Sequence, residues 1–353
     1  MKLTRLHRGY AYIQHNTNKA STKRIEFVDL TKGFCICLVV ILHVFGESAG
    51  NTFNTLNLFL FLIPPYFILS GLLFKQYSGF QEFFKKKTNQ LLIPFLFTYF
   101  IICIPSIILL SKSSLNLSCF WSCTDLKLQL GIDGAVWFLM CLFFQNIIFS
   151  FLYSINHKMP FIVTSSGVIG IGGYALNIAN IHLPLWIDSA MTALPFFLFG
   201  YCIRKYSQIL FTGITKKQIL YLLISILILI ATSLYNDFAN TTIIVYGVNH
   251  FNVNPLCLYL GGITGFYIIF MFAKFIKRLP IFSYIGRYSI VVLLTHLLYL
   301  FIIRNILYKI GVNQELFMVN VCIFIFIILL SIPTIYLCIR FLPYWFAQKD
   351  LIK

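Results

Sequence analysis

The stretch KGFCICLVVILH, residues 32–43, places a lysine and a histidine at the two ends of an otherwise apolar run. It belongs to a longer apolar segment, residues 26–46, which is long enough to cross a bilayer as one helix. An ionisable side chain inside such a helix is costly to insert, so its presence there indicates a function. The segment therefore predicts both a membrane helix and a site on that helix.

The ionisable residues of this segment fall on one face of the predicted helix. Lys32 and His43 are separated by about three helical turns plus 20°, which is about 16 Å along the axis. Asp29 and Glu47 fall on the same side, so all four lie within an arc of roughly 60°. Because a charged face toward lipid would be prohibitively costly, we expect it to face the bundle interior or a water-filled cavity.

The composition is that of a polytopic membrane protein. Of the 353 residues, 59% are hydrophobic and only 10% are charged, more apolar surface than a soluble domain could bury. We expect an all-α integral membrane domain over residues 24–345, with a polar extension at 1–23 and a short tail at 346–353. The domain is predicted to be a bundle of about ten transmembrane helices. The apolar runs are 26–46, 56–75, 91–111, 134–154, 161–179, 190–206, 217–236, 255–274, 284–304 and 316–340.

Basic residues predict the orientation of this bundle. With the amino terminus inside, 22 lysines and arginines fall on the cytoplasmic side and only 4 on the opposite side, a strong positive-inside bias. We expect both termini in the cytoplasm and the protein in the inner (cytoplasmic) membrane. The net charge of +17 does not indicate nucleic-acid binding, because the basic residues occur in short groups between apolar runs. The run at residues 85–87 suits anionic lipid or, less commonly, a coenzyme's phosphates.

The polar residues of the first helix have two interpretations each. Asp29 and Lys32, three residues apart, are equally suited to an interfacial ion pair or to binding a ligand. His43 is a general-base candidate, because a neutral imidazole with the acid Glu47 one turn later can accept a proton near neutral pH. The alternative for His43 is a packing role. A metal site is disfavoured, since His43 and Glu47 lack a third ligand at a suitable spacing.

Cysteine usage adds little chemistry. Most of the ten cysteines lie inside apolar runs, where they behave as small hydrophobes. Cys119 and Cys123 share a polar loop and are either a disulfide or two free thiols. No spacing of cysteine and histidine is typical of a metal site. The acids Asp133 and Asp188 are expected at the solvated surface, with the orientation of sugar hydroxyls as the alternative.

Four segments resemble the acyltransferase 3 family of bacterial membrane acyltransferases. RIEFVDLTKGFCICLVVILH (residues 24–43) is similar to the family's first helix, in which ten residues separate a basic residue from a histidine. PYFILSGLLFK (65–75) resembles its aromatic Ser-Gly segment, and VWFLMCLFF (136–144) its Trp-Phe-Leu segment. IGRYSIVVLLTHLLY (285–299) resembles its Gly-x-x-Ser…Thr-His segment. The family often has arginine where this chain has Lys32. FFLFGYCIRK (196–205) is a weaker match.

The resemblance implies transfer of an acyl group, usually acetyl, from cytoplasmic acyl-coenzyme A to a hydroxyl of an extracytoplasmic glycan or lipid-linked sugar. The coenzyme is then a substrate, and no permanently bound cofactor or metal is expected. On this interpretation His43, with Glu47, is catalytic, either as a base or as a transient acyl carrier. The donor would contact Lys32, Asp29, Ser70, Gly71 and Arg287, and the acceptor would contact Trp137 and His296. Helix packing explains Ser70 and Gly71 equally well. A place in the aromatic belt at the membrane interface explains Trp137 equally well.

A transporter is the main alternative, because intramembrane histidine, lysine and aspartate also suit a proton-coupled exporter of polysaccharide or small acids. Inverted repeats and paired broken helices, which many such transporters have, are not visible in the sequence. A catalytically inactive scaffold for glycan assembly is a third possibility. The sequence leaves open the acceptor, the acyl chain, direct transfer versus an acyl-enzyme, and the oligomeric state.

Overall fold

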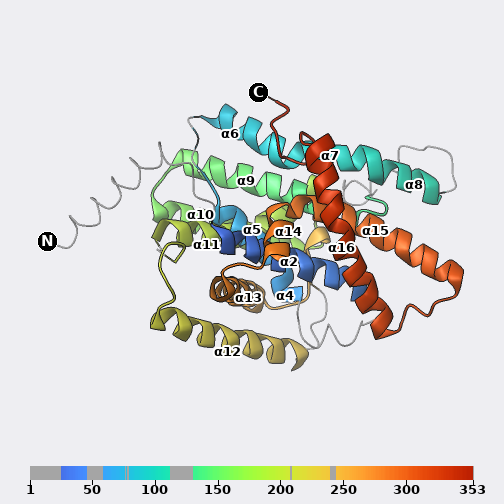
Figure 1. Cartoon of the computed structure of the whole chain (residues 1–353). Helices are drawn as coiled ribbons and strands as arrows, with labels where there is room; N and C mark the ends of the chain where they lie inside the picture. The colour runs from blue at the N-terminus through green and yellow to red at the C-terminus, as the bar shows by residue number, and fades with distance from the viewer. Residues whose placement is uncertain are drawn as a thin grey trace.

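The computed structural model describes residues 25–45, 59–75, 77, 79–111, 130–206, 209–238 and 244–352. Within these ranges the protein is an all-α bundle, with nine helical spans that are long and apolar enough to cross a membrane (Figure 1). Eight of these spans contain α2 (Glu26–Phe45), α9 (Trp137–Ile155), α10 (Met159–Ile178), α11 (Ile187–Tyr206), α12 (Lys216–Phe238), α13 (Pro255–Ile276), α15 (Ser289–Ile310) and α16 (Phe317–Phe341). The ninth is a composite helix that begins at Phe80.

The composite helix begins eleven residues before the predicted apolar run and contains two π-helical segments. It consists of α6 (Phe80–Lys87), η1 (Thr88–Leu92), α7 (Ile93–Thr98), η2 (Tyr99–Cys103) and α8 (Ile104–Ser111). Hydropathy underestimated its length because the first turns carry charged residues. Each π segment ends two residues before a proline, at Pro94 and at Pro105. Since proline lacks a backbone N–H, the wider π turns let the helix continue past it.

Two helices predicted as continuous are broken, which corrects those predictions. Residues 56–75 contain α4 (Phe59–Leu62) and α5 (Pro64–Leu72) with a bend at Ile63, because two consecutive prolines remove two helical hydrogen bonds. Residues 284–304 contain the end of α14 (Pro280–Arg287) and most of α15, separated by Tyr288 at φ −116° and ψ 30°. This break allows α14 to cross α2 while α15 runs alongside it.

Two close helix crossings depend on glycine. A Cβ atom added to Gly71 of α5 would overlap the carbonyl oxygen of Phe197, and one added to Gly200 of α11 would overlap that of Ile68. At the crossing of α2 and α14, Gly33 and Gly286 have the same relation to the opposing backbone. Small residues let helices approach closely, which is how helices in lipid gain packing energy. These crossings fix how α5 and α2 face the rest of the bundle.

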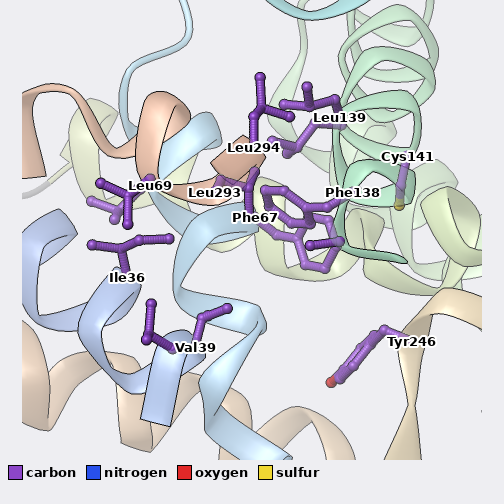
Figure 2. Packing of buried hydrophobic residues seen from close by; sticks show 14 of the residues in the cluster. Ile36, Val39, Phe67, Leu69, Phe138, Leu139, Cys141, Tyr246, Leu293 and Leu294 are labelled. Atoms are coloured by element: carbon purple, nitrogen blue, oxygen red, sulfur yellow. The ribbon is translucent and has the colours of Figure 1, made fainter. Parts of the chain in front are cut away.

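Apolar side chains from four helices meet in the centre of the bundle. Ile36 of α2, Phe67 of α5, Phe138 of α9 and Leu294 of α15 converge there (Figure 2). Phe67 and Phe138 are in ring contact, with centroids 5.2 Å apart. This cluster holds the four helices that surround the candidate site.

A short hairpin packs against α10 and α11. Strands β1 (Ile244–Val245) and β2 (His250–Phe251) pair antiparallel around the 3-10 turn η6 (Tyr246–Val248). The Asn177 side chain bonds the backbone N–H and carbonyl of Phe251 at 2.9 Å each. Asn249, fully buried in the left-handed region at φ 50°, bonds the carbonyl of Gly173 and the hydroxyl of Thr192. The hairpin is therefore fixed to α10 and α11.

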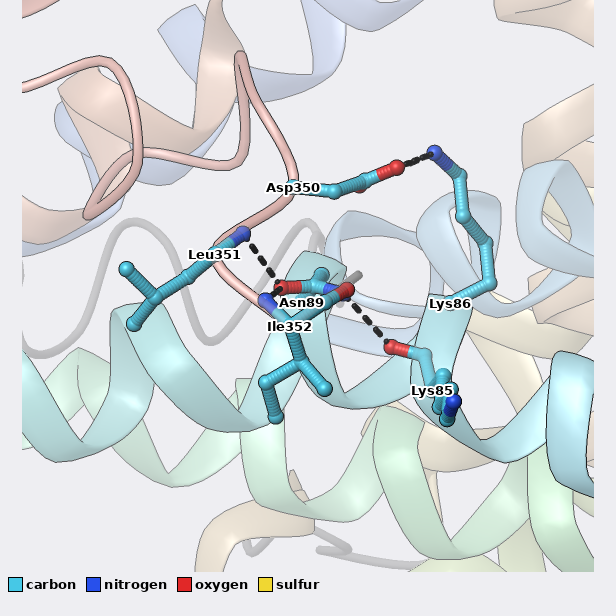
Figure 3. A network of polar contacts seen from close by, with 6 residues as sticks. All are labelled: Lys85, Lys86, Asn89, Asp350, Leu351 and Ile352. Carbon is cyan, nitrogen blue, oxygen red and sulfur yellow. Dashed lines mark hydrogen bonds and ion pairs between the residues drawn. The ribbon is translucent and has the colours of Figure 1, made fainter.

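The carboxyl-terminal tail is held against the start of the composite helix (Figure 3). The side-chain oxygen of Asn89, Oδ1, accepts hydrogen bonds from the backbone N–H groups of Leu351 at 2.7 Å and Ile352 at 2.9 Å. Its amide nitrogen donates to the carbonyl of Ile352 at 2.9 Å. Lys86 pairs with Asp350 at 2.9 Å. One lysine of the basic run 85–87 is thus engaged within the protein.

Candidate active site

The amino end of α2 carries a group of opposite charges. Arg287, at the end of α14, lies with its Nε 3.6 Å from the Asp29 carboxylate and its Nη2 3.7 Å from that of Glu26. Arg278 Nε is 3.4 Å from Glu26. The close crossing of α14 over α2 makes these contacts possible. Two predicted donor-site residues, Asp29 and Arg287, are therefore neighbours although 258 positions separate them in the sequence.

Lys32 lies one turn beyond Asp29 on the same helix and is half-buried. Its backbone carbonyl accepts a hydrogen bond from the Tyr66 hydroxyl at 3.2 Å, which ties α2 to α5 at this level. The predicted polar face of α2 therefore begins at the charged group of its amino end and continues past Lys32 toward His43.

The other two predicted donor-site residues, on α5, have structural partners. The Ser70 hydroxyl accepts a hydrogen bond from the Asn146 amide of α9 at 3.1 Å. Gly71 lies at the crossing with α11, where only a residue without a side chain fits. Neither residue lines the cavity at His43. The packing interpretation accounts for both positions, and contact with a donor remains a prediction.

His43 lines a cavity of about 160 Å³ in the middle of the four-helix cluster. The walls are largely apolar, and the polar groups among them are His43, Tyr66, Trp137 and Ser289. The full lining is Ile36, Val39, His43, Ile63, Tyr66, Leu91, Ala135, Trp137, Phe138, Leu139, Leu142, Ser289, Ile290 and Leu293. Among these, His43 is the side chain whose ring nitrogen can accept a proton from a substrate and return it.

Trp137, the first residue of α9, lies in the wall of the same cavity. Its indole packs against Gly247 of the hairpin, where an added Cβ would lie 3.0 Å from Nε1. The sequence resemblance assigned Trp137 to the acceptor, and the structure brings it into one pocket with His43. A flat indole face beside the imidazole is a surface on which a sugar ring can stack.

His296 of α15 is the second histidine at this site. It is 1% exposed, and its ring centroid lies 5.2 Å from that of His43 with the planes 47° apart. Its Nδ1 lies 3.0 Å and 2.9 Å from the carbonyl oxygens of Val292 and Leu293. Sequence reasoning assigned His296 to the acceptor. The structure places it behind His43, outside the cavity lining.

Two acids are more buried than the sequence suggested. Asp133 and Asp188 are both 0% exposed, so the prediction of solvated surface residues is wrong. Asp188 accepts the Ser189 N–H at 2.9 Å and lies 3.4 Å from Nδ1 of His182. Burial raises the pKa of Asp133, which precedes the spanning helix, well above its usual range. Asp133 directly precedes the 3-10 turn η4 (Gly134–Val136), and Asp188 is the second residue of α11.

Several earlier assignments fall on parts of the chain that the structure does not describe. Glu47, the predicted partner of His43, lies outside the described residues, as do Cys119 and Cys123. Conversely, the sequence reading missed Tyr66 and Ser289 as cavity residues. Both lie within the quoted segments 65–75 and 285–299, and the spacing of Ile63 and Tyr66 on one helix face was the available signal.

Comparisons with known proteins agree with the sequence resemblance. A family model described as an acyltransferase domain matches residues 25–340, nearly the whole chain. No curated protein and no solved structure showed significant similarity.

Proposed function

We propose a specific reaction for this chain, which belongs to the acyltransferase family and is a multi-pass membrane acyltransferase. The donor is cytoplasmic acyl-coenzyme A, with acetyl as the acyl group. The acceptor is a hydroxyl of a glycan or lipid-linked sugar on the opposite face of the inner membrane. This proposal depends on the observation that His43 lines an otherwise largely apolar cavity between the four helices and the composite helix.

Donor binding is assigned to the charged amino end of α2. Arg287 and Lys32 supply cations there, and guanidinium and ammonium groups are the usual partners of phosphate oxygens. His43 lies about 16 Å further along the same helix, a distance comparable with the length of a pantetheine arm. A coenzyme held by its phosphates at the amino end would therefore present its thioester near the imidazole.

His43 is assigned the role of general base in the transfer. It removes the proton from the acceptor hydroxyl as that oxygen attacks the thioester carbonyl carbon. The carbon–sulfur bond then breaks, and the imidazolium returns the proton to the leaving thiolate, so the histidine is unchanged after one turnover. Trp137 would hold the sugar ring beside the base. Attack by His43 itself, to give an acyl-histidine, uses the same positions.

The experiment compares acetyl content of the surface glycan in a deletion strain complemented with wild type, His43→Ala or His43→Gln. We expect both variants to lose acetylation, because glutamine keeps hydrogen bonding but lacks basicity, and positioned proton transfer contributes on the order of 10²–10⁴-fold. His157→Ala, at an exposed histidine between α9 and α10, is the matched control and should acetylate normally. Protein levels are measured in the same membranes. Normal acetylation by well-expressed His43→Ala would refute the mechanism.

A further inference from the structure

The protonation state of His296 follows from its neighbours. A carbonyl oxygen can only accept, and Nδ1 lies within 3.0 Å of two of them, on Val292 and Leu293. Nδ1 must therefore carry the hydrogen. In the neutral ring the other nitrogen, Nε2, then carries a lone pair that can accept a hydrogen bond.

That lone pair has no partner among the described residues. Nε2 of His296 is buried, and no hydrogen-bond donor of the described chain reaches it. Buried polar atoms nearly always have a partner, so an orphan acceptor calls for an explanation. The aromatic ring in contact with it is that of His43, at a centroid distance of 5.2 Å.

A base at His43 needs such an acceptor. When His43 takes a proton, both of its ring nitrogens carry hydrogen, and only one of them can face the reacting oxygen. The groups around it that can form hydrogen bonds are Tyr66 on α5, Trp137 on α9, and Ser289 and His296 on α15. Among the described residues of these elements there is no carboxylate in the cavity wall. In serine hydrolases a carboxylate fixes the histidine tautomer from behind.

We propose that His296 is the positioning residue for His43. In this structure the two rings are in contact but share no hydrogen bond. Once the His43 ring turns toward it, Nε2 of His296 accepts the N–H of the His43 nitrogen that faces away from the substrate, which leaves the other nitrogen free as the base. The same contact stabilises the imidazolium while it holds the proton of the acceptor hydroxyl. His296 touches neither donor nor acceptor, in contrast to the substrate contact expected from the sequence. The inference rests on the proposed role of His43.

The test uses membrane vesicles from the complemented deletion strain, which contain the native acceptor, supplied with labelled acetyl-coenzyme A. Label entering membrane material is measured over a range of coenzyme concentrations. For His296→Leu we expect kcat to fall on the order of 10²-fold while KM for the coenzyme is unchanged. His296→Gln, whose side-chain oxygen can still accept, should keep more of the rate. The double variant with His43→Ala should be no worse than His43→Ala alone.

Chemical rescue separates hydrogen bonding from space filling. In His296→Ala, added imidazole should restore part of the rate, whereas pyrrole, a ring of similar size without an acceptor lone pair, should not. Equal rescue by both would assign His296 to packing and overturn the inference. A wild-type rate in folded His296→Leu, with His43→Ala inactive, would overturn the inference but leave the proposed function intact. Absence of labelling by wild type above the deletion background would overturn both. If His296→Leu is unstable, His296→Gln and the rescue pair decide the matter.

Discussion

Removal of the Asn89 side chain should release the carboxyl-terminal tail. Asn89 is 3% exposed and makes three hydrogen bonds to the tail, at 2.7–2.9 Å to Leu351 and Ile352. If each hydrogen bond contributes about 1 kcal/mol net, Asn89→Ala should lower the free energy of tail docking by about 3 kcal/mol. Since 1.4 kcal/mol corresponds to tenfold, protection of the Leu351 and Ile352 amides from hydrogen exchange should fall roughly 100-fold.

Two further variants make this magnitude a sharp test. Asn89→Asp keeps the oxygen that accepts both backbone N–H groups and loses only the side-chain N–H donor. Protection should therefore fall less in Asn89→Asp than in Asn89→Ala. Lys86→Ala removes an ion pair whose side chains are 37% and 46% exposed. Such pairs contribute about 1 kcal/mol or less, so protection should fall by fivefold at most. Equal losses in Lys86→Ala and Asn89→Ala, or none in Asn89→Ala, would refute the assignment of tail docking to Asn89.

Three other predictions follow from charge, packing and orientation. Asn116 lies between the apolar runs 91–111 and 134–154, in a stretch that the positive-inside bias puts on the external side. A cysteine there should be labelled by an impermeant thiol reagent on intact cells, whereas one at His157 should be labelled only after lysis; the reverse pattern would invert the topology. Lys32→Ala should raise KM for the acyl-coenzyme A while Lys32→Arg, which keeps the charge, should not; an unchanged KM in folded Lys32→Ala would reassign the residue to topology or helix pairing. Gly71→Ala should cost about 1–3 kcal/mol of stability because its Cβ meets backbone of α11, whereas Gly167→Ala, which has open space, should leave the melting temperature unchanged or slightly higher. Equal melting temperatures for the two alanine variants would contradict the close crossing.

The local pattern of apolar residues was sufficient to predict most of the fold. Runs of about 20 apolar residues located the nine spans, most of them near their observed bounds. This works because a helix satisfies all of its backbone hydrogen bonds internally, which a segment inside a bilayer requires. The failures also have local causes. The bend at Ile63 depends on two prolines that hydropathy ignores, and the early start of the composite helix at Phe80 is hidden by charges in its first turns. Only the break at Tyr288 lacks such a signal.

The polar face of α2 was visible in the sequence, since the angular positions of Lys32 and His43 follow from helical periodicity alone. Periodicity describes one helix at a time, so it could not show which residues of other helices oppose that face. The pairing of Arg287 with Asp29 and of His296 with His43 depends on α14 and α15 lying along α2. The crossing of α14 over α2 results from close packing at Gly33 and Gly286, which are distant in sequence. The sequence therefore predicted the chemistry of individual residues. Helix packing determined which residues are their neighbours, and it also determined the burial of Asp133 and Asp188.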